Sequence, residues 1–435
     1  MNPSDTHILI AGAGIGGLAA ALALSRAGLR VTVLEQADAF GEVGAGVQVS
    51  PNAFGVLAGW GLRDALLKVV NFPDVLQARD AATNTLLAEL PLGDTARRTY
   101  GCDYATIHRA DLHRVLLDAV RQQPLVSLHL EAKINAISES EDAVQVTTVQ
   151  GDNYSADALI GCDGLWSQVR KHVLGEQMPL ATGHVAWRAL LPMHVVPPDL
   201  QAERQSGRVI AWLAPRMHAI AYPVHRSQFM NLVVITEDDQ PAATPNPQSW
   251  SRDATGLSPL KNMKLDAQIG IQPLYSLPNA LSNLLQKVTE PQGGGWTRWT
   301  LFDRAPMTSP VEMAHPAHPR IALLGDAAHP MRPYLAQGAA MALEDAQALA
   351  AGFAAAFSQG KHDFPVQIPT VLQQYAHNRW KRAARVQARS RRNGTIFHMD
   401  GPLRWGRDVA LALLGPRVMD LPWLYRHTSP VESMF

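Results

Sequence analysis

Residues 12–17, Gly-Ala-Gly-Ile-Gly-Gly, form a glycine-rich turn whose spacing suits the binding of a pyrophosphate. The apolar run 7–11 precedes the turn and an alanine- and leucine-rich segment follows it, an order that predicts strand, turn and helix. Gly12 permits the turn, Gly14 lets a ligand approach the backbone, and Gly17 lets helix and strand pack closely. The start of such a helix offers free N–H groups and a positive dipole end to phosphate oxygens.

A second predicted strand, residues 29–34, ends at Glu35. A carboxylate at this place can accept hydrogen bonds from a ribose, and it disfavours a ribose 2′-phosphate. Strand, turn, helix, second strand and acidic terminus therefore together predict a bound dinucleotide that contains adenosine diphosphate. The alternative is a βαβ unit whose glycines serve packing only, which leaves Glu35 without a role.

Two further carboxylates follow predicted strands. Asp163-Gly164 comes after the apolar run 158–161, and Gly325-Asp326 comes after residues 320–324. Acidic turns at strand ends are where open α/β sheets bind ligands, although the first of them also suits a plain helix-capping turn. An alanine-rich helix is expected after Gly325-Asp326, and its N-terminus could stabilise a second anionic centre.

The elements that must position these residues predict an α/β (α+β) fold. From about residue 182 four strands follow one another without helices, which is typical of an antiparallel sheet that faces a substrate. We expect a Rossmann-like dinucleotide-binding domain interrupted by this sheet and followed by a C-terminal helical segment. The expected boundaries are 1–180 and 301–360 for the nucleotide domain, 181–300 for the sheet and 361–435 for the helices.

Connecting segments are predicted as well. Residues 237–256 are typical of a polar loop, 258–287 of one or two helices, and 358–369 of a loop. A long basic helix is expected over about 370–392. Its arginines indicate a solvated face or acidic partners within the protein rather than nucleic acid.

Composition argues against several function classes. Lys+Arg and Asp+Glu are both 38, so no net charge attracts nucleic acid. Cys102 and Cys162 give neither a disulfide framework nor a metal-ligand spacing, so we expect a cytoplasmic protein without a metal. The apolar stretch 8–24 lacks a basic n-region, and no integral membrane association is expected. The expected assembly is a monomer or a homodimer.

Together, the glycine turn with Glu35, Asp163-Gly164 and Gly325-Asp326 resemble the motifs of single-component FAD-dependent aromatic hydroxylases. Residues 44–53 and 325–345 look most like salicylate hydroxylase and 3-hydroxybenzoate 6-hydroxylase relatives. The resemblance implies FAD as the resident cofactor, NAD(P)H (NADH favoured) as a transient reductant, and O2 and a small aromatic acid as partners. In that family a flavin hydroperoxide transfers oxygen to an electron-rich phenol.

The resemblance also implies cofactor residues. Glu35 would hold the adenosine ribose, Arg109 would reach the phosphates or the ribityl chain, and Asp326 would bind the ribityl chain. Asp163 would serve FAD and passing NAD(P)H. The turn residues that would contact the pyrophosphate are Gly12, Gly14, Ile15 and Gly17.

The flavin ring has its own implied neighbours. Val47 and Gln48 would lie beside the isoalloxazine ring. The backbone of Gly338 and Ala339 would face its pyrimidine edge, where reduced flavin carries negative charge. A helix N-terminus at that place would stabilise the charge.

The substrate phenol needs a group that removes or shares its proton, so an acceptor is expected in the sheet. His218 and Tyr222 share one strand face, with Cα atoms about 13 Å apart, so they could flank a ring but would not share one proton. His218-x-x-x-Tyr222 is similar to a pocket motif of the hydroxybenzoate 6-hydroxylase branch. The alternative is that His218 is a satisfied histidine in a turn.

Three other residues are substrate candidates. Pro333 stands before Tyr334 where that branch has glutamine, a departure that looks more like some salicylate hydroxylases. Arg188 could meet a substrate carboxylate or pair internally. His329 follows the acidic turn, and we interpret it as structural rather than as a base.

We therefore predict an FAD-dependent monooxygenase that hydroxylates a phenolic aromatic acid of the salicylate or hydroxybenzoate class. Two alternatives stay open on the sequence. One is a flavin reductase or epoxidase of the same fold that acts on a non-aromatic substrate. The other is a non-catalytic FAD-binding protein.

Overall fold

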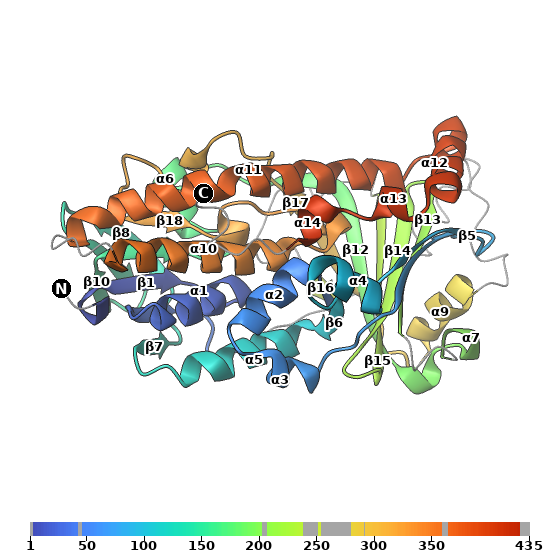
Figure 1. The fold of residues 1–435 in the computed structure, drawn as a ribbon, viewed down its shortest axis with the longest axis horizontal. Helices are drawn as coiled ribbons and strands as arrows, with labels where there is room; N and C mark the ends of the chain where they lie inside the picture. The colour runs from blue at the N-terminus through green and yellow to red at the C-terminus, as the bar shows by residue number, and fades with distance from the viewer. Residues whose placement is uncertain are drawn as a thin grey trace.

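A computed structural model describes residues 3–41, 46–201, 207–237, 251–253, 280–290, 292–358 and 364–426. Two sheets lie at opposite ends of the elongated molecule, and long helices run between them (Figure 1). This mixed α/β architecture confirms the predicted fold class.

The first sheet is parallel and has the strand order β18-β11-β1-β2-β7. The central strands β1 and β11 and the strand β18 are almost entirely buried and apolar, whereas the edge strand β7 is only partly buried and carries polar residues. Helix α1 (Ile15–Arg26) packs directly against this sheet, and α5 (Arg109–Arg121) and α10 (Gly338–Ser358) pack against α1. The strands are β1 (His7–Ala11), β2 (Arg30–Leu34), β7 (Val126–His129), β11 (Ala158–Gly161) and β18 (Ile321–Leu323).

The second sheet has eight strands in the order β16-β17-β12-β15-β14-β13-β4-β5. It is antiparallel except where β13 pairs with β4 in parallel. The pair β4–β5 comes from the first part of the chain and extends this sheet, so the sheet is not built from one continuous segment. The strands are β4 (Val75–Asp80), β5 (Leu86–Pro91), β12 (Leu180–Pro192), β13 (Arg208–Ala214), β14 (Met217–Val224), β15 (Phe229–Glu237), β16 (Ser251–Asp253) and β17 (Thr297–Asp303).

Side-chain alternation gives this sheet two distinct faces. The outer face carries Trp187 and Trp212 and packs against α9 (Ala280–Thr289). The inner face carries Tyr222 and Ile235. Because Tyr334 and Phe397, from outside this sheet, cover the inner face, it is the face turned toward the rest of the molecule.

Helix α11 (Phe364–Phe397) runs along the molecule from the first sheet to the second (Figure 1). Its arginines pair with acidic groups elsewhere in the protein: Arg379 with Asp345 at 2.7 Å, and Arg391 with Asp303 at 2.7 Å. These ion pairs confirm the internal partners expected for the basic helix. The helix α12 (Gly401–Leu414) follows it.

The remaining elements are short. A two-stranded ladder joins β3 (Gly46–Val49) to β6 (Ala105–His108), and a meander is formed by β8 (Ile134–Glu139), β9 (Val144–Thr148) and β10 (Asn153–Ala156). The other helices are α2 (Pro51–Gly59), α3 (Arg63–Leu67), α4 (Gly93–Tyr100), α6 (Gln168–Leu174), α7 (Pro198–Gln201), α13 (Pro416–Met419) and α14 (Pro422–Tyr425).

Several expectations were wrong in detail. The range 364–369, expected as loop, is the first part of α11, which keeps Pro369 inside it. Residues 251–253, expected as loop, form β16, and α4 had not been predicted. The expected helix over 258–287 is described only from Ala280, since 258–279 lie outside the described residues. Within the described ranges, no helix is both long and apolar enough to cross a membrane.

Candidate active site

The turn between β1 and α1 accepts only glycine at two positions. Gly12 has φ of +94°, and a Cβ there would lie 2.8 Å from the carbonyl oxygen of Cys162. A Cβ on Gly17 would lie 1.9 Å from the carbonyl oxygen of Gly12. The turn therefore folds back tightly on the helix, where the predicted turn residues Gly14 and Ile15 are the N-cap and the buried first residue of α1.

Glu35 lies directly against this turn. Its Oε2 accepts a hydrogen bond from the backbone N–H of Ala13 at 2.7 Å, and its Oε1 accepts one from Ala37 at 2.9 Å. The N-terminus of α1 has no acidic residue in its first turn, and its N-cap, Gly14, provides no side-chain hydrogen bond. Backbone donors and the positive dipole end are therefore available to an anion beside a ribose-binding carboxylate.

A second helix N-terminus, that of α10 at Gly338, faces Asp326. The Oδ1 of Asp326 lies 3.9 Å from the position of a Cβ on Gly338, and Asp326 is exposed. Ala339 is half-buried in the first turn of α10, which contains no acidic residue. This end of the helix thus combines a hydrogen-bonding carboxylate with a positive dipole.

Asp345 holds the turn that carries Asp326. It accepts hydrogen bonds from the Gly325 backbone (3.2 Å) and Arg379 (2.7 Å), and its Oδ2 lies 2.5 Å from His329 Nε2. Burial alone would raise the pKa of Asp345, but the charges of His329 and Arg379 outweigh burial and lower the pKa to about 2. This arrangement agrees with the interpretation of His329 as structural.

Asp163 caps a helix. Its Oδ1 accepts a hydrogen bond from the Ser167 hydroxyl at 2.5 Å, and its Oδ2 accepts from the backbone of Gln168 and Val169 at 2.7 and 3.1 Å. Both carboxylate oxygens are therefore engaged at the start of α6, as the helix-capping alternative describes. Any contact of this turn with a nucleotide would come from its position beside Gly12, whose missing Cβ would otherwise meet Asp163.

The inner face of the second sheet brings Tyr222 and Arg188 together with β3. Gln48 is buried on β3, and it is hydrogen-bonded both to Tyr222 and to the Tyr104 hydroxyl (2.6 Å). Val47 is half-buried beside it. A Cβ on Gly46 would lie only 2.5 Å from the Tyr222 ring, so β3 passes directly over this part of the sheet.

Arg188 is a buried cation on this face. Burial, and then the nearby charge of Arg109, lower the pKa of Arg188 to about 10. Its guanidinium lies 5.1 Å from the ring centre of Trp299. Within the described part of the chain, Arg188 Nε and Asn231 Nδ2 are buried without a hydrogen-bond partner.

His218 lies farther along the same face, among aromatic rings. Its Nδ1 is 2.9 Å from His398 Nε2, and its ring centre is 5.2 Å from that of Tyr334. Burial lowers the pKa of His218 well below 6.5, with His398 adding to the effect. The Tyr334 hydroxyl lies 2.6 Å from His184 Nδ1, whereas Pro333 is exposed.

His218 and Tyr222 thus belong to two different groups of contacts, as their predicted separation implied. Asn231 and His184 were not identified from the sequence, although alternation along β15 and β12 places both on the inner face. His398, after the end of α11, carries no local signal, because only the packing of that helix brings it to the sheet.

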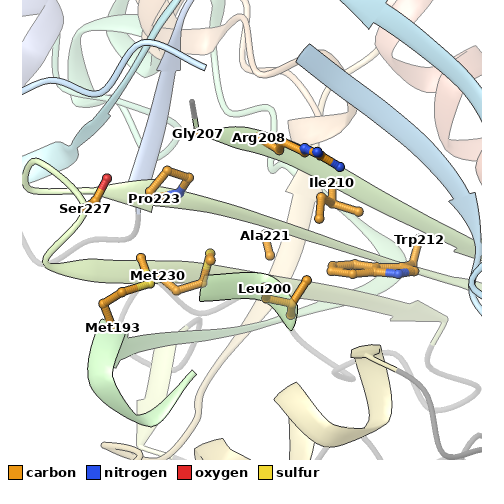
Figure 2. A pocket seen from close by; sticks show the side chains of 10 residues that line it. All are labelled: Met193, Leu200, Gly207, Arg208, Ile210, Trp212, Ala221, Pro223, Ser227 and Met230. Atoms are coloured by element: carbon orange, nitrogen blue, oxygen red, sulfur yellow. The ribbon is translucent and has the colours of Figure 1, made fainter. Parts of the chain in front are cut away.

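A pocket lies on the other side of this sheet (Figure 2). Ile210, Trp212 and Ala221 line it from strands of the sheet, and Met193 and Leu200 line it from the segment after β12 and from α7. None of the predicted substrate residues lines it. Its apolar walls continue the outer hydrophobic core rather than the polar inner face.

Known proteins share this architecture over nearly the whole chain. A family described as "FAD binding domain" matches residues 5–265 and 302–390. The chain is 33% identical over 422 residues to 3-hydroxybenzoate 6-hydroxylase 1 of Aquipseudomonas alcaligenes, a match that covers 96% of this chain and 97% of that protein. The chain belongs to the FAD-dependent aromatic hydroxylases.

Two further comparisons place this hydroxylase among its relatives. It is 32% identical over 398 residues to 6-hydroxynicotinate 3-monooxygenase of Bordetella bronchiseptica, covering 91% of this chain and 93% of the relative. A solved salicylate hydroxylase substrate complex superimposes with a TM-score of 0.77 at 25% identity, covering 99% of this chain and 98% of that structure. The predicted family and the predicted enzyme class, a flavoprotein monooxygenase, are confirmed.

The cofactor of this hydroxylase is FAD, and the site fits it. Gly12 and Gly17 have no room for side chains against the neighbouring backbone, which keeps the turn before α1 as tight as a pyrophosphate-binding turn requires, and Glu35 offers a carboxylate for a ribose. Asp326 and the N-terminus of α10 form a second group of polar atoms that could bind the cofactor. An extended dinucleotide therefore has matching groups at both ends.

Proposed function

We propose that the chain hydroxylates a phenolic aromatic acid of the salicylate or hydroxybenzoate class, with NAD(P)H as reductant and O2 as oxidant. Bound FAD supplies the activation of oxygen. The observation that carries the proposal is the buried Arg188 on the inner face, whose Nε makes no hydrogen bond in the described structure. The carboxylate of an aromatic acid would supply both the missing acceptor and the counter-charge.

Two unsatisfied donors point to the same kind of ligand. Arg188 Nε and Asn231 Nδ2 are both buried donors without a partner among the described residues. A buried donor left unsatisfied costs about 1–3 kcal/mol, and more when it is charged. With its pKa near 10, Arg188 stays a cation at neutral pH, so an anionic acceptor suits it better than a neutral one.

The sheet register sets the separation between Arg188 and His218. Arg188 lies opposite Val233, which lies opposite Ile220, two residues from His218 on the neighbouring strand. Two residues along a strand and two strand spacings across it put the Cα atoms of Arg188 and His218 roughly 12 Å apart. In the proposal, one aromatic ring spans that separation, with its carboxylate toward Arg188 and its hydroxyl toward His218.

His218 suits the role of proton acceptor. Because burial keeps its pKa well below 6.5, its ring is neutral near pH 7 and has a lone pair to accept a phenolic proton. Removing that proton raises the electron density of the ring that is to be hydroxylated. Tyr222, fixed by its hydrogen bond to Gln48, would hold the ring from the other side.

The names of the relatives agree with this substrate class. Hydroxybenzoate and hydroxynicotinate are both aromatic rings that carry one carboxylate and one hydroxyl group. The two substituents correspond to the two ends of the inner face, Arg188 with Asn231 and His218. This agreement supports the class, and product analysis must identify the member and the ring position.

The test is a panel of ring acids assayed by product identity with NADH and with NADPH. The panel contains 3-hydroxybenzoate, salicylate and 6-hydroxynicotinate, with benzoate and phenol as compounds that lack one substituent each. We expect a hydroxylated product only where both substituents are present. Turnover of phenol as efficient as that of every acid would contradict the role given to Arg188.

Arg188→Met tests the carboxylate contact directly. Removing one partner of a buried charge pair costs about 2–5 kcal/mol, so KM for the acid should rise at least about 30-fold. Arg298→Met is the matched control, because Arg298 stacks on Trp187 on the outer face of the same sheet. Equal KM values for both variants would refute the assignment.

The catalytic assignments have a separate readout. His218→Ala and Tyr222→Phe should lower the fraction of NADH oxidation that is coupled to product more than they lower FAD content. Peroxide formation measured beside product gives that fraction. Loss of FAD with normal chemistry per bound flavin would contradict both assignments.

A further inference from the structure

His218 is the inner end of a chain of three titratable side chains that reaches the surface. His218 Nδ1 lies 2.9 Å from His398 Nε2, and His398 Nδ1 lies 3.1 Å from Glu237 Oε1. His218 is only 2% exposed, whereas the side chain of Glu237 is 31% exposed. The three residues come from β14, from the turn after α11 and from the end of β15.

The outer carboxylate fixes the direction of the hydrogen bonds. A hydrogen bond from His398, opposed by partial burial and reinforced by Arg216, lowers the pKa of Glu237 to about 2. Glu237 is therefore ionised near neutral pH and can only accept, so His398 Nδ1 carries a proton. With its Nδ1 proton directed at Glu237, His398 can accept from His218 Nδ1 only through the Nε2 lone pair of its neutral ring, and that arrangement leaves His218 Nε2 as the acceptor.

We propose that His398 and Glu237 carry the phenolic proton of the substrate from His218 to solvent. The inference rests on the proposed function, in which His218 meets the phenol. The phenolic O–H bond breaks and a bond from hydrogen to His218 Nε2 forms, while the Nδ1 proton of His218 passes to His398 Nε2. The resulting His398 imidazolium is paired with the Glu237 carboxylate, which passes the Nδ1 proton of His398 to water.

The charges balance at each stage. The substrate becomes a phenolate, His218 ends neutral with its proton on the other nitrogen, and His398 gains one positive charge opposite Glu237. Loss of that proton to water returns His398 to neutrality. The reverse path delivers a proton to the product when it leaves as a phenol, so no additional reactant is required.

The groups around His398 favour a transient rather than a permanent positive charge on the histidines. Burial, and then His398 and Arg332, lower the pKa of His184 to about 4, so His184 is a neutral ring stacked on His398 at 5.0 Å. Arg216 Nε contacts Glu237 Oε2 at 3.0 Å and keeps the carboxylate in place. The titratable and charged groups around His398 and His218 are His184, Arg216, Glu237, Arg332 and Tyr334.

A hydrogen bond that only stabilised the fold would not require His398 to link a buried histidine to a carboxylate at the surface. His398 uses both ring nitrogens, one toward a buried histidine and one toward a carboxylate that meets solvent. A second histidine–glutamate pair, His318 with Glu139 at 2.5 Å, lies away from the inner face, and the further histidine beside it, His172, is partly exposed rather than buried. It provides the matched control.

The experiment follows the ionisation of a phenolic probe in the FAD-loaded protein. 3-Hydroxy-4-nitrobenzoate is mixed rapidly with the holoenzyme at a pH below the pKa of the free probe, and the visible absorbance of the phenolate is recorded. His398→Gln and Glu237→Gln should slow its appearance by about 10²-fold with little change in probe Kd. Glu237→Asp, which keeps a carboxylate on a shorter side chain, should recover part of the rate lost in Glu237→Gln, and the control Glu139→Gln should retain the wild-type rate.

Each outcome decides between the inference and the proposed function. Wild-type rates in both glutamine variants would overturn the relay and leave the proposed hydroxylation intact. A wild-type protein that ionises no phenolic probe and hydroxylates no phenolic acid would overturn the proposed function, and the relay with it. If either variant loses FAD, the rate in wild-type protein in mixtures of H2O and D2O decides. We expect the rate to depend on the D2O fraction in the way that the transfer of more than one proton requires. A dependence that fits the transfer of a single proton would overturn the relay.

Discussion

Gly17→Ala tests whether the tight turn after β1 is the anchor of the cofactor. The new Cβ would lie 1.9 Å from the carbonyl oxygen of Gly12, whereas an ordinary contact is about 3.4 Å. Relief of the overlap needs a displacement of about 1.5 Å between the turn and the start of α1. A hydrogen bond of normal length does not survive such a shift, because contacts beyond about 3.5 Å no longer count as hydrogen bonds.

The expected effect follows from the donors that move. Two backbone N–H groups bonded to an anionic phosphate contribute about 1.5–3 kcal/mol each, so their loss costs at least about 3 kcal/mol. FAD should therefore bind the variant at least about 10²-fold more weakly. Titration of the apoprotein with FAD, followed by flavin fluorescence, measures the Kd.

Gly406→Ala is the control for this substitution. Gly406 lies in α12, and a Cβ there would meet nothing within 4 Å. Its apoprotein should bind FAD like the wild type. A Gly17→Ala variant with wild-type FAD affinity would refute the assignment of this turn to the cofactor, because the geometry leaves no way to accommodate the methyl group without moving the donors.

Three other substitutions test separate parts of the molecule. Asp345→Asn removes one of the two carboxylates that pair with the buried Arg379, the other being Glu344, and a loss of about 1.5–3 kcal/mol in stability is expected, seen as a lower melting temperature; an unchanged melt would contradict it. Gly46→Ala places a Cβ 2.5 Å from the Tyr222 ring, so aromatic acids should bind more weakly while FAD content is retained; unchanged substrate Kd would refute the contact. With its pKa lowered to about 4, His184 stays neutral in the folded protein while the unfolded chain takes up a proton below about pH 6.5. Thermal stability should therefore fall between about pH 6.5 and 4, and His184→Gln should fall less steeply; equal slopes would contradict this reasoning.

The parts of the site that are built from residues close together in the sequence could be predicted. The glycine turn and Glu35 belong to one βαβ unit, so their spacing predicts their contact, and Glu35 indeed accepts from Ala13 at 2.7 Å. Alternation likewise predicts that His218 and Tyr222 share a strand face, which the register of β14 with β15 confirms.

Contacts between residues that are far apart in the sequence could not be predicted, because they depend on how the helices and sheets pack together. His398 meets His218 across 180 residues, and only the length and placement of α11 bring them together. Pro369 favoured a loop where α11 continues, because a proline removes one backbone donor, yet the packing of the helix outweighs that loss. For Asp163, a cofactor contact and a helix cap use the same residue types, so sequence alone cannot separate them.

The register of the second sheet, rather than the glycine turn, sets the choice of substrate in this interpretation. Its donors, Arg188 and Asn231, and its acceptor, His218, lie in different rows of the inner face, and backbone pairing fixes the rows relative to one another. A ring acid held at both ends can rotate little between them, so the distance from its carboxylate to its hydroxyl selects among isomers. Tyr334 covers the His218 end of that face, which makes it the residue whose exchange should shift the preferred isomer without disturbing FAD.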